Sequence, residues 1–133
     1  MNLERIQVEL QRLHVGGQLA ELITQCERPI VLYREVPTSG ERFELPHTAD
    51  VIVPVPSGYP ASMIDLAGLV VGSAFLGRVK GGTNNQGILN ADGRTWQLAS
   101  YHPHNGGGGP PWDQNKYGFH TYLDHLISWL DKL

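Results

Sequence analysis

Ser100 and His102 are the pair of side chains in this sequence whose types and spacing could do chemistry. They close the string W-Q-L-A-S-Y-H at 96–102, which precedes a glycine run and then Pro-Pro-Trp-Asp. In an extended strand, residues i and i+2 project from one face, so the hydroxyl and the imidazole would lie side by side. A serine hydroxyl needs a neighbouring base to become a nucleophile near pH 7. The pair predicts an activated oxygen nucleophile; the alternative is a polar strand end that caps loop backbone groups.

Asp113 is the next carboxylate along the chain after this pair, and it directly follows Trp112. Two interpretations are open for it. It could be the N-cap of a final helix, or it could be the carboxylate that orients His102. The cap is favoured, because Asp is among the preferred residues at helix N-caps.

The other histidines and the cysteine carry weaker hypotheses. His102 and His104 could chelate a metal from one side, with His120 and His125 as further ligands. A spacing of five residues turns about 140° around a helix, however, so the last two do not share a face. We therefore expect no metal and no cofactor. The single cysteine, Cys26, excludes an intramolecular disulfide, and an isolated cysteine is more often a small buried hydrophobe than a nucleophile.

Hydrophobic periodicity predicts the elements that position these residues. A helix is expected over residues 2–14, where Leu3, Ile6, Leu10 and Leu13 form one stripe. A second helix is expected from about residue 117 to the C-terminus, burying Phe119, Leu123, Leu126 and Leu130. Strands are expected at 19–24, 30–36, 49–55 and 66–71, and residues 94–101 are a further short strand candidate. Residues 77–93 are polar and glycine-rich, and we expect a long excursion with one hairpin near 88–89.

These elements predict an α+β fold: an antiparallel meander of about four strands flanked by N-terminal and C-terminal helices. Tyr59 and Pro60 should lie at the turn that leaves the third strand. The length of 133 residues predicts a single domain over 1–133. The net charge of −3 gives no bias toward nucleic acid or a membrane surface. No signal peptide and no apolar run of about 20 residues is visible, which favours a cytoplasmic protein.

Three short motifs in a fixed order carry a resemblance to a known family. They are L-P-x-x-x-D-V-I-V-x-V-P-S-G-Y-P at 45–60, W-x-x-x-S-x-H at 96–102 and W-D at 112–113. Together with the helix–strands–helix order, they resemble a bacterial E2-like family of the ubiquitin-conjugating enzyme (UBC-fold) superfamily. The likeness covers roughly residues 25–132. It is a family that lacks the usual catalytic cysteine.

The resemblance implies a transferase that acts as a carrier in a conjugation pathway. An E1-like activating enzyme would load the C-terminal glycine of a ubiquitin-like protein onto the E2-like site. Usual E2 proteins use a cysteine after the fourth strand, and this sequence has none there. The resemblance therefore implies an oxyester on Ser100, with His102 as the base. Asp113, as the carboxylate that could orient His102, completes the set of candidate catalytic residues. An oxyester is less reactive toward amines, which makes hydroxyl acceptors more plausible.

The sequence departs from the usual E2 pattern at one further motif. E2 proteins carry His-Pro-Asn before the nucleophile, whereas here the nearest string, H-P-H-N at 102–105, follows Ser100. If that string is the counterpart, the domain is inert and binds a ubiquitin-like or E1-like partner without forming a bond. Otherwise Asn84 or Asn85, rather than Asn105, would supply the missing donor. A third hypothesis is an unrelated small α+β hydrolase with the same Ser–His pair.

Overall fold

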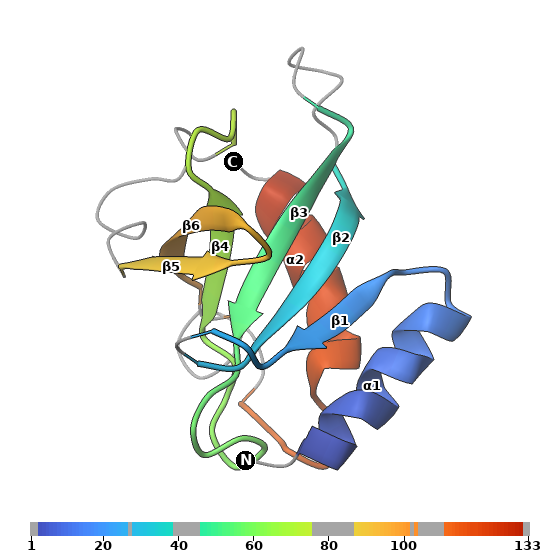
Figure 1. Ribbon diagram of the computed structural model, residues 1–133. Helices are drawn as coiled ribbons and strands as arrows, with labels where there is room; N and C mark the ends of the chain where they lie inside the picture. The colour runs from blue at the N-terminus through green and yellow to red at the C-terminus, as the bar shows by residue number, and fades with distance from the viewer. Residues whose placement is uncertain are drawn as a thin grey trace.

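The computed structural model describes residues 3–26, 28–38, 46–75, 87–101, 103 and 111–131 (Figure 1). Within these residues it is an α+β fold of two helices and one antiparallel sheet. The elements in chain order are α1 (Leu3–Val15), β1 (Ala20–Ile23), β2 (Ile30–Pro37), β3 (Thr48–Pro54), β4 (Leu66–Val70), β5 (Ile88–Ala91), β6 (Arg94–Ser100) and α2 (Phe119–Asp131). No helix among the described residues is long and apolar enough to cross a membrane.

The sheet has six strands in the order β1-β2-β3-β4-β6-β5, so the expectation of about four strands was too low. The meander β1 to β4 is present as predicted, but the β5–β6 hairpin extends the sheet beyond β4. Its turn is formed by Asp92 and Gly93, with φ of 56° and 69°. Two residues at positive φ match the twist of a tight antiparallel hairpin. Residues 88–93, expected to be the end of a long excursion, therefore form strand β5 and its turn into β6.

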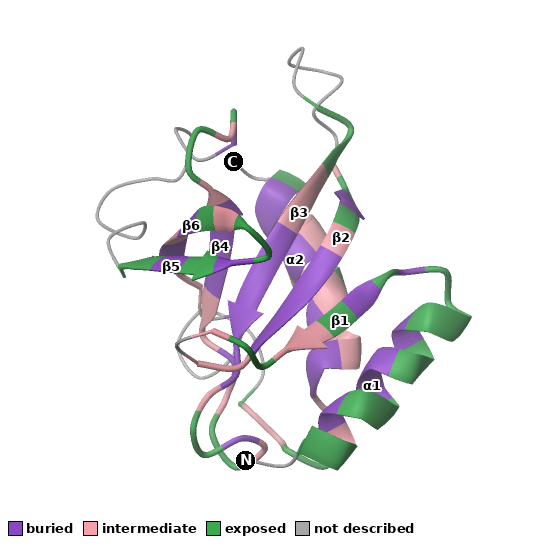
Figure 2. Cartoon of the chain, viewed as in Figure 1, coloured by how far each residue is buried: buried purple, intermediate pink, exposed green. Residues whose placement is uncertain are grey.

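The hairpin curls in front of the sheet, while α2 crosses behind it and α1 lies beside β1 (Figure 1). The buried residues of both helices belong to one core cluster. Each face therefore has its own core, and the buried residues run through the centre of the sheet (Figure 2). The rear core joins α1 and α2 to the sheet. The front core consists of Ile30, Leu32, Ile52, Leu89, Ala91, Trp96 and Leu98. A Cβ at Gly68 would lie 2.7 Å from Ile52 Cγ1, so a glycine in β4 lets the curled strands approach.

The turn between β3 and β4 contains Tyr59 and Pro60, as predicted. Their peptide bond is cis, and the Tyr59 ring is buried in the rear core. Trp112, from the segment before α2, donates its Nε1–H to the Pro60 carbonyl at 2.9 Å. This hydrogen bond joins the segment before α2 to the turn between β3 and β4.

Helix α2 buries a slightly different stripe from the one predicted. Phe119, Leu126 and Leu130 are buried as expected, but Leu123 is only half-buried. Tyr122 and Trp129 are buried in its place. The helix packs against both α1 and β2, which rotates the buried stripe toward these two aromatic side chains.

We expect Leu126→Ala to lower the free energy of unfolding by about 2–5 kcal/mol, because truncation leaves a cavity in a closed core. Leu126 is 0% exposed. Leu123→Ala, on the same helix but half-buried, is the matched control and should lose less. Chemical denaturation followed by circular dichroism measures both. Equal losses in the two variants would show that α2 is not docked as described.

Candidate functional site

Ser100 is the last residue of β6 and pairs with Leu66, the first residue of β4. Strand alternation places its side chain on the face of Trp96 and Leu98, which belong to the front core. This face is the one that the helices do not cover (Figure 1). Ser100 is half-buried, so its side chain is partly accessible to solvent.

Tyr101 fixes the chain immediately after Ser100. Its N–H donates to the Asp65 carbonyl at 3.0 Å, and its hydroxyl donates to the His125 carbonyl in α2 at 2.8 Å. Its ring stacks on Trp129 at 5.6 Å between centroids. Burial raises the pKa of Tyr101, so the phenol stays protonated and keeps donating. Ser100 is therefore held between a paired strand and a side chain anchored on α2.

Several residues of the predicted site lie outside the described part of the chain. These are His102, His104, Asn84, Asn85 and Asn105. The expected Ser100–His102 pair and the expected asparagine donor therefore stay predictions. Of the neighbouring positions, Pro103 is described and is buried.

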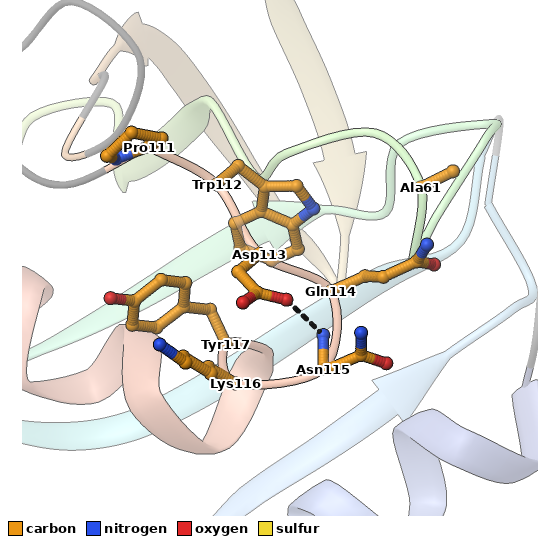
Figure 3. Close-up of a pocket in the computed structure, with 8 residues that line it drawn as sticks. All are labelled: Ala61, Pro111, Trp112, Asp113, Gln114, Asn115, Lys116 and Tyr117. Atoms are coloured by element: carbon orange, nitrogen blue, oxygen red, sulfur yellow. Dashed lines mark hydrogen bonds between the residues drawn. The ribbon is translucent and has the colours of Figure 1, made fainter.

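Asp113 does not cap α2, so the favoured interpretation of this residue was wrong. Its Oδ1 accepts the N–H of Asn115 at 2.9 Å (Figure 3), and its carbonyl accepts the N–H groups of Lys116 and Tyr117. Asp113 thus caps its own turn, an arrangement typical of Asp at the start of a tight turn. The helix begins further along the chain, at Phe119. The second interpretation, a carboxylate that orients His102, stays a prediction.

The turn that Asp113 closes forms one wall of a hollow of about 510 Å³ (Figure 3). The lining residues are Ala61, Pro111, Trp112, Asp113, Gln114, Asn115, Lys116 and Tyr117. The Trp112 ring lies 6.3 Å from that of Tyr59 and 6.1 Å from that of Tyr117. Two aromatic rings beside a carboxylate and two side-chain amides suit a polar peptide segment. The sequence pointed to Trp112 and Asp113, but not to this hollow.

Glu9 is a buried carboxylate that sequence reasoning missed, and it holds the turn and α2 in place. It is 4% exposed. Its Oε1 accepts the Tyr59 hydroxyl at 2.5 Å and the Phe119 N–H at 3.1 Å, so Glu9 does the capping expected of Asp113. Its Oε2 accepts Arg5 Nε–H at 3.0 Å. Burial, together with the Glu9 carboxylate, raises the pKa of Tyr59, which keeps that hydroxyl protonated.

Arg5 extends the same contact to the turn. Besides Glu9, its guanidinium donates to the carbonyl of Gln114 and, at 3.1 Å, to that of Tyr117. The sequence held one signal for this contact. Glu9 places a charge within the apolar stripe of residues 2–14, four residues after Arg5. A buried acid must find donors, and here they come from three separate segments.

No family model, curated protein or solved structure matches the chain. Functional assignment therefore depends on the residues and their geometry. What the described residues offer is a half-buried serine at a fixed strand end and, at the same end of the sheet, an open hollow with aromatic and polar walls.

Cys26 follows β1 and lies at the edge of the front core. The Cys26 thiol donates to the Arg28 carbonyl at 2.7 Å and packs at the edge of the front core. Cys26 is half-buried, so the structure agrees only in part with the expected small buried hydrophobe. Within the described residues, no three His, Cys, Asp or Glu side chains lie together as metal ligands would.

Proposed function

We propose that this chain is an E2-like protein of the UBC-fold superfamily that carries a ubiquitin-like protein as an oxyester on Ser100. One observation carries the proposal: Ser100 ends β6 half-exposed, on the sheet face that the helices leave uncovered, with Tyr101 fixed directly behind it. A nucleophile at such a position is reachable by an extended peptide and is held by a rigid element.

The order of the elements supports the proposal. An N-terminal helix, a four-strand meander, a Tyr59-Pro60 turn, a tryptophan packed on that turn and a C-terminal helix follow one another as the resemblance implies. The β5–β6 hairpin goes beyond a four-stranded meander. Ser100 lies on this added hairpin, so the proposed nucleophile differs from the E2 cysteine in its supporting strand as well as its chemistry.

The proposed step is an acyl transfer from a thioester to a hydroxyl. Ser100 Oγ attacks the carbonyl carbon of the ubiquitin-like C-terminus while it is bound to the cysteine of an E1-like enzyme. The new C–O bond replaces the C–S bond, and the proton of Oγ passes through His102 to the departing thiolate. Oδ1 of Asp113 accepts the N–H of Asn115, which leaves Oδ2 and the second lone pair of Oδ1 for an orienting role toward His102.

A second function is favoured by the hollow beside Trp112 and Tyr117. Its aromatic and amide walls suit non-covalent capture of a ubiquitin-like or E1-like protein, with no bond to Ser100. The H-P-H-N string after Ser100 favours this inert module. A cytoplasmic location belongs to both versions of the proposal.

The deciding experiment is to incubate the chain with its cognate E1-like and ubiquitin-like proteins and ATP, then measure intact mass. A carrier gains the mass of the ubiquitin-like protein less one water, and the adduct survives reductant but not mild alkali. A complex that co-elutes without a covalent adduct supports the binding module. Turnover of small activated esters with no partner protein would support a hydrolase instead.

His102→Ala should slow loading by roughly 10²–10⁴-fold, the usual effect of losing a general base. His104→Ala is the matched control, because it removes an imidazole two residues further along the chain. Single-turnover loading rates measured from quenched samples compare the two. If both variants load at the parental rate, His102 is not the base.

A further inference from the structure

The joint between α1 and α2 contains a buried imidazole nitrogen close to a carboxylate that binds several donors. The Tyr59 hydroxyl, the Phe119 N–H and Arg5 Nε–H all donate to the Glu9 carboxylate. His120 Nδ1 lies 3.7 Å from Glu9 Oε2, beyond hydrogen-bond length.

His120 Nδ1 is buried and has no hydrogen-bond partner among the described residues. Glu9, Arg5 and Arg12 of α1 act on the charge of the ring, and Lys116, from the turn before α2, lines the same hollow as His120. The ring also stands in the first turn of α2, where the positive end of the helix dipole opposes a cation. Of these groups, only Glu9 favours a protonated ring, and the Glu9 carboxylate already forms an ion pair with Arg5.

We propose that His120 is a proton-controlled latch on this joint, closed while the imidazole is neutral and opened when it takes up a proton from solvent. A neutral ring can stay half-buried beside Glu9, with its Nδ1 out of contact with solvent. An imidazolium placed between two arginines and a helix N-terminus is better stabilised by water, which it reaches when the start of α2 moves away from α1.

Opening of the latch acts on the wall of the hollow described above. Glu9 holds Phe119, and Arg5 holds the carbonyls of Gln114 and Tyr117. Residues 114–119 are therefore tied to α1 through the same cluster that contains His120. Acidification is expected to loosen this turn, and with it the hollow, whether or not Ser100 carries an acyl group.

The direction follows from linkage. Burial is the largest cause that lowers the pKa of His120 below its usual 6.5, ahead of the attraction of Glu9, which raises it. The closed joint therefore binds the proton less tightly than the open joint, and closure weakens as the pH falls below 6.5. If the open form has an ordinary histidine pKa, the opening constant rises at most about tenfold between pH 7.5 and 5.5.

Amide hydrogen exchange of Phe119 reports this opening directly, because its N–H donates to Glu9. We expect its protection factor to fall several-fold, up to about tenfold, from pH 7.5 to 5.5 in the parent. The fall should vanish in His120→Gln, which cannot titrate. His125→Gln is the matched control on the same helix and should keep the fall.

Two results would overturn the latch. One is a parental protection factor that does not change with pH. The other is the same fall persisting in His120→Gln, which would assign it to another group such as Glu9. If His120→Gln does not fold, the ring protons of His120 in the parent are titrated by NMR, and a midpoint at or above 6.5 overturns the proposal. None of these measurements uses an E1-like or ubiquitin-like protein, so the latch stands or falls separately from the carrier.

Discussion

Replacing Gly118 with alanine is expected to lower the free energy of unfolding by about 2–4 kcal/mol, because it displaces a buried carboxylate from its donors. A Cβ at Gly118 would lie 2.2 Å from Glu9 Oε2 and 2.5 Å from Glu9 Cδ. The Glu9 side chain cannot yield without losing Tyr59, Phe119 or Arg5 as a partner. Urea denaturation followed by tryptophan fluorescence measures the loss.

Two comparisons make this prediction specific. Gly16→Ala is the matched control, because the nearest atom to its Cβ would be a carbonyl oxygen at 3.5 Å, an ordinary contact. Its effect should be about 1 kcal/mol or less. In a Glu9→Ala background the clash is gone, so adding Gly118→Ala should then cause little further loss. Similar losses in Gly118→Ala and Gly16→Ala would contradict the role given to Glu9.

Local periodicity was enough to predict most of the secondary structure. Repeats of 3.6 residues located both helices, alternation located β3, and other short strand candidates matched β1, β2, β4 and β6. The predicted number of strands was too low because the polar composition of residues 77–93 was taken to indicate a loop. Asp92-Gly93 between two short runs of alternating residues is a strong hairpin signal, and it marks the β5–β6 turn.

The candidate site was predictable only where it depends on local geometry. The place of Ser100 beside Leu98 and Trp96 follows from strand alternation alone. The role of Asp113 did not follow, because the cap of α2 comes from Glu9, which is 110 residues from Phe119 in sequence. A contact of that kind is set by how α1 docks, and no pattern around Asp113 reports it.

Ser100→Ala is expected to abolish the covalent adduct while leaving the fold intact. The change removes only the Oγ that we propose forms the ester, at a half-buried position at the end of β6. Effects of such substitutions on stability are usually within about 1 kcal/mol. Intact mass after incubation with the E1-like protein, the ubiquitin-like protein and ATP measures the adduct, and thermal unfolding checks the fold. An adduct that persists in Ser100→Ala and maps to Cys26 or a lysine would move the site elsewhere.

The most direct test of Ser100 as the nucleophile is the intact mass of the Ser100→Cys variant after loading, with and without reductant. A cysteine at the same position forms a thioester, because the thiol is both more acidic and more nucleophilic than the hydroxyl. The account predicts an adduct that reductant removes in Ser100→Cys, beside a parental adduct that reductant leaves in place. An adduct with the same resistance to reductant in both proteins, or no adduct in either, would contradict it.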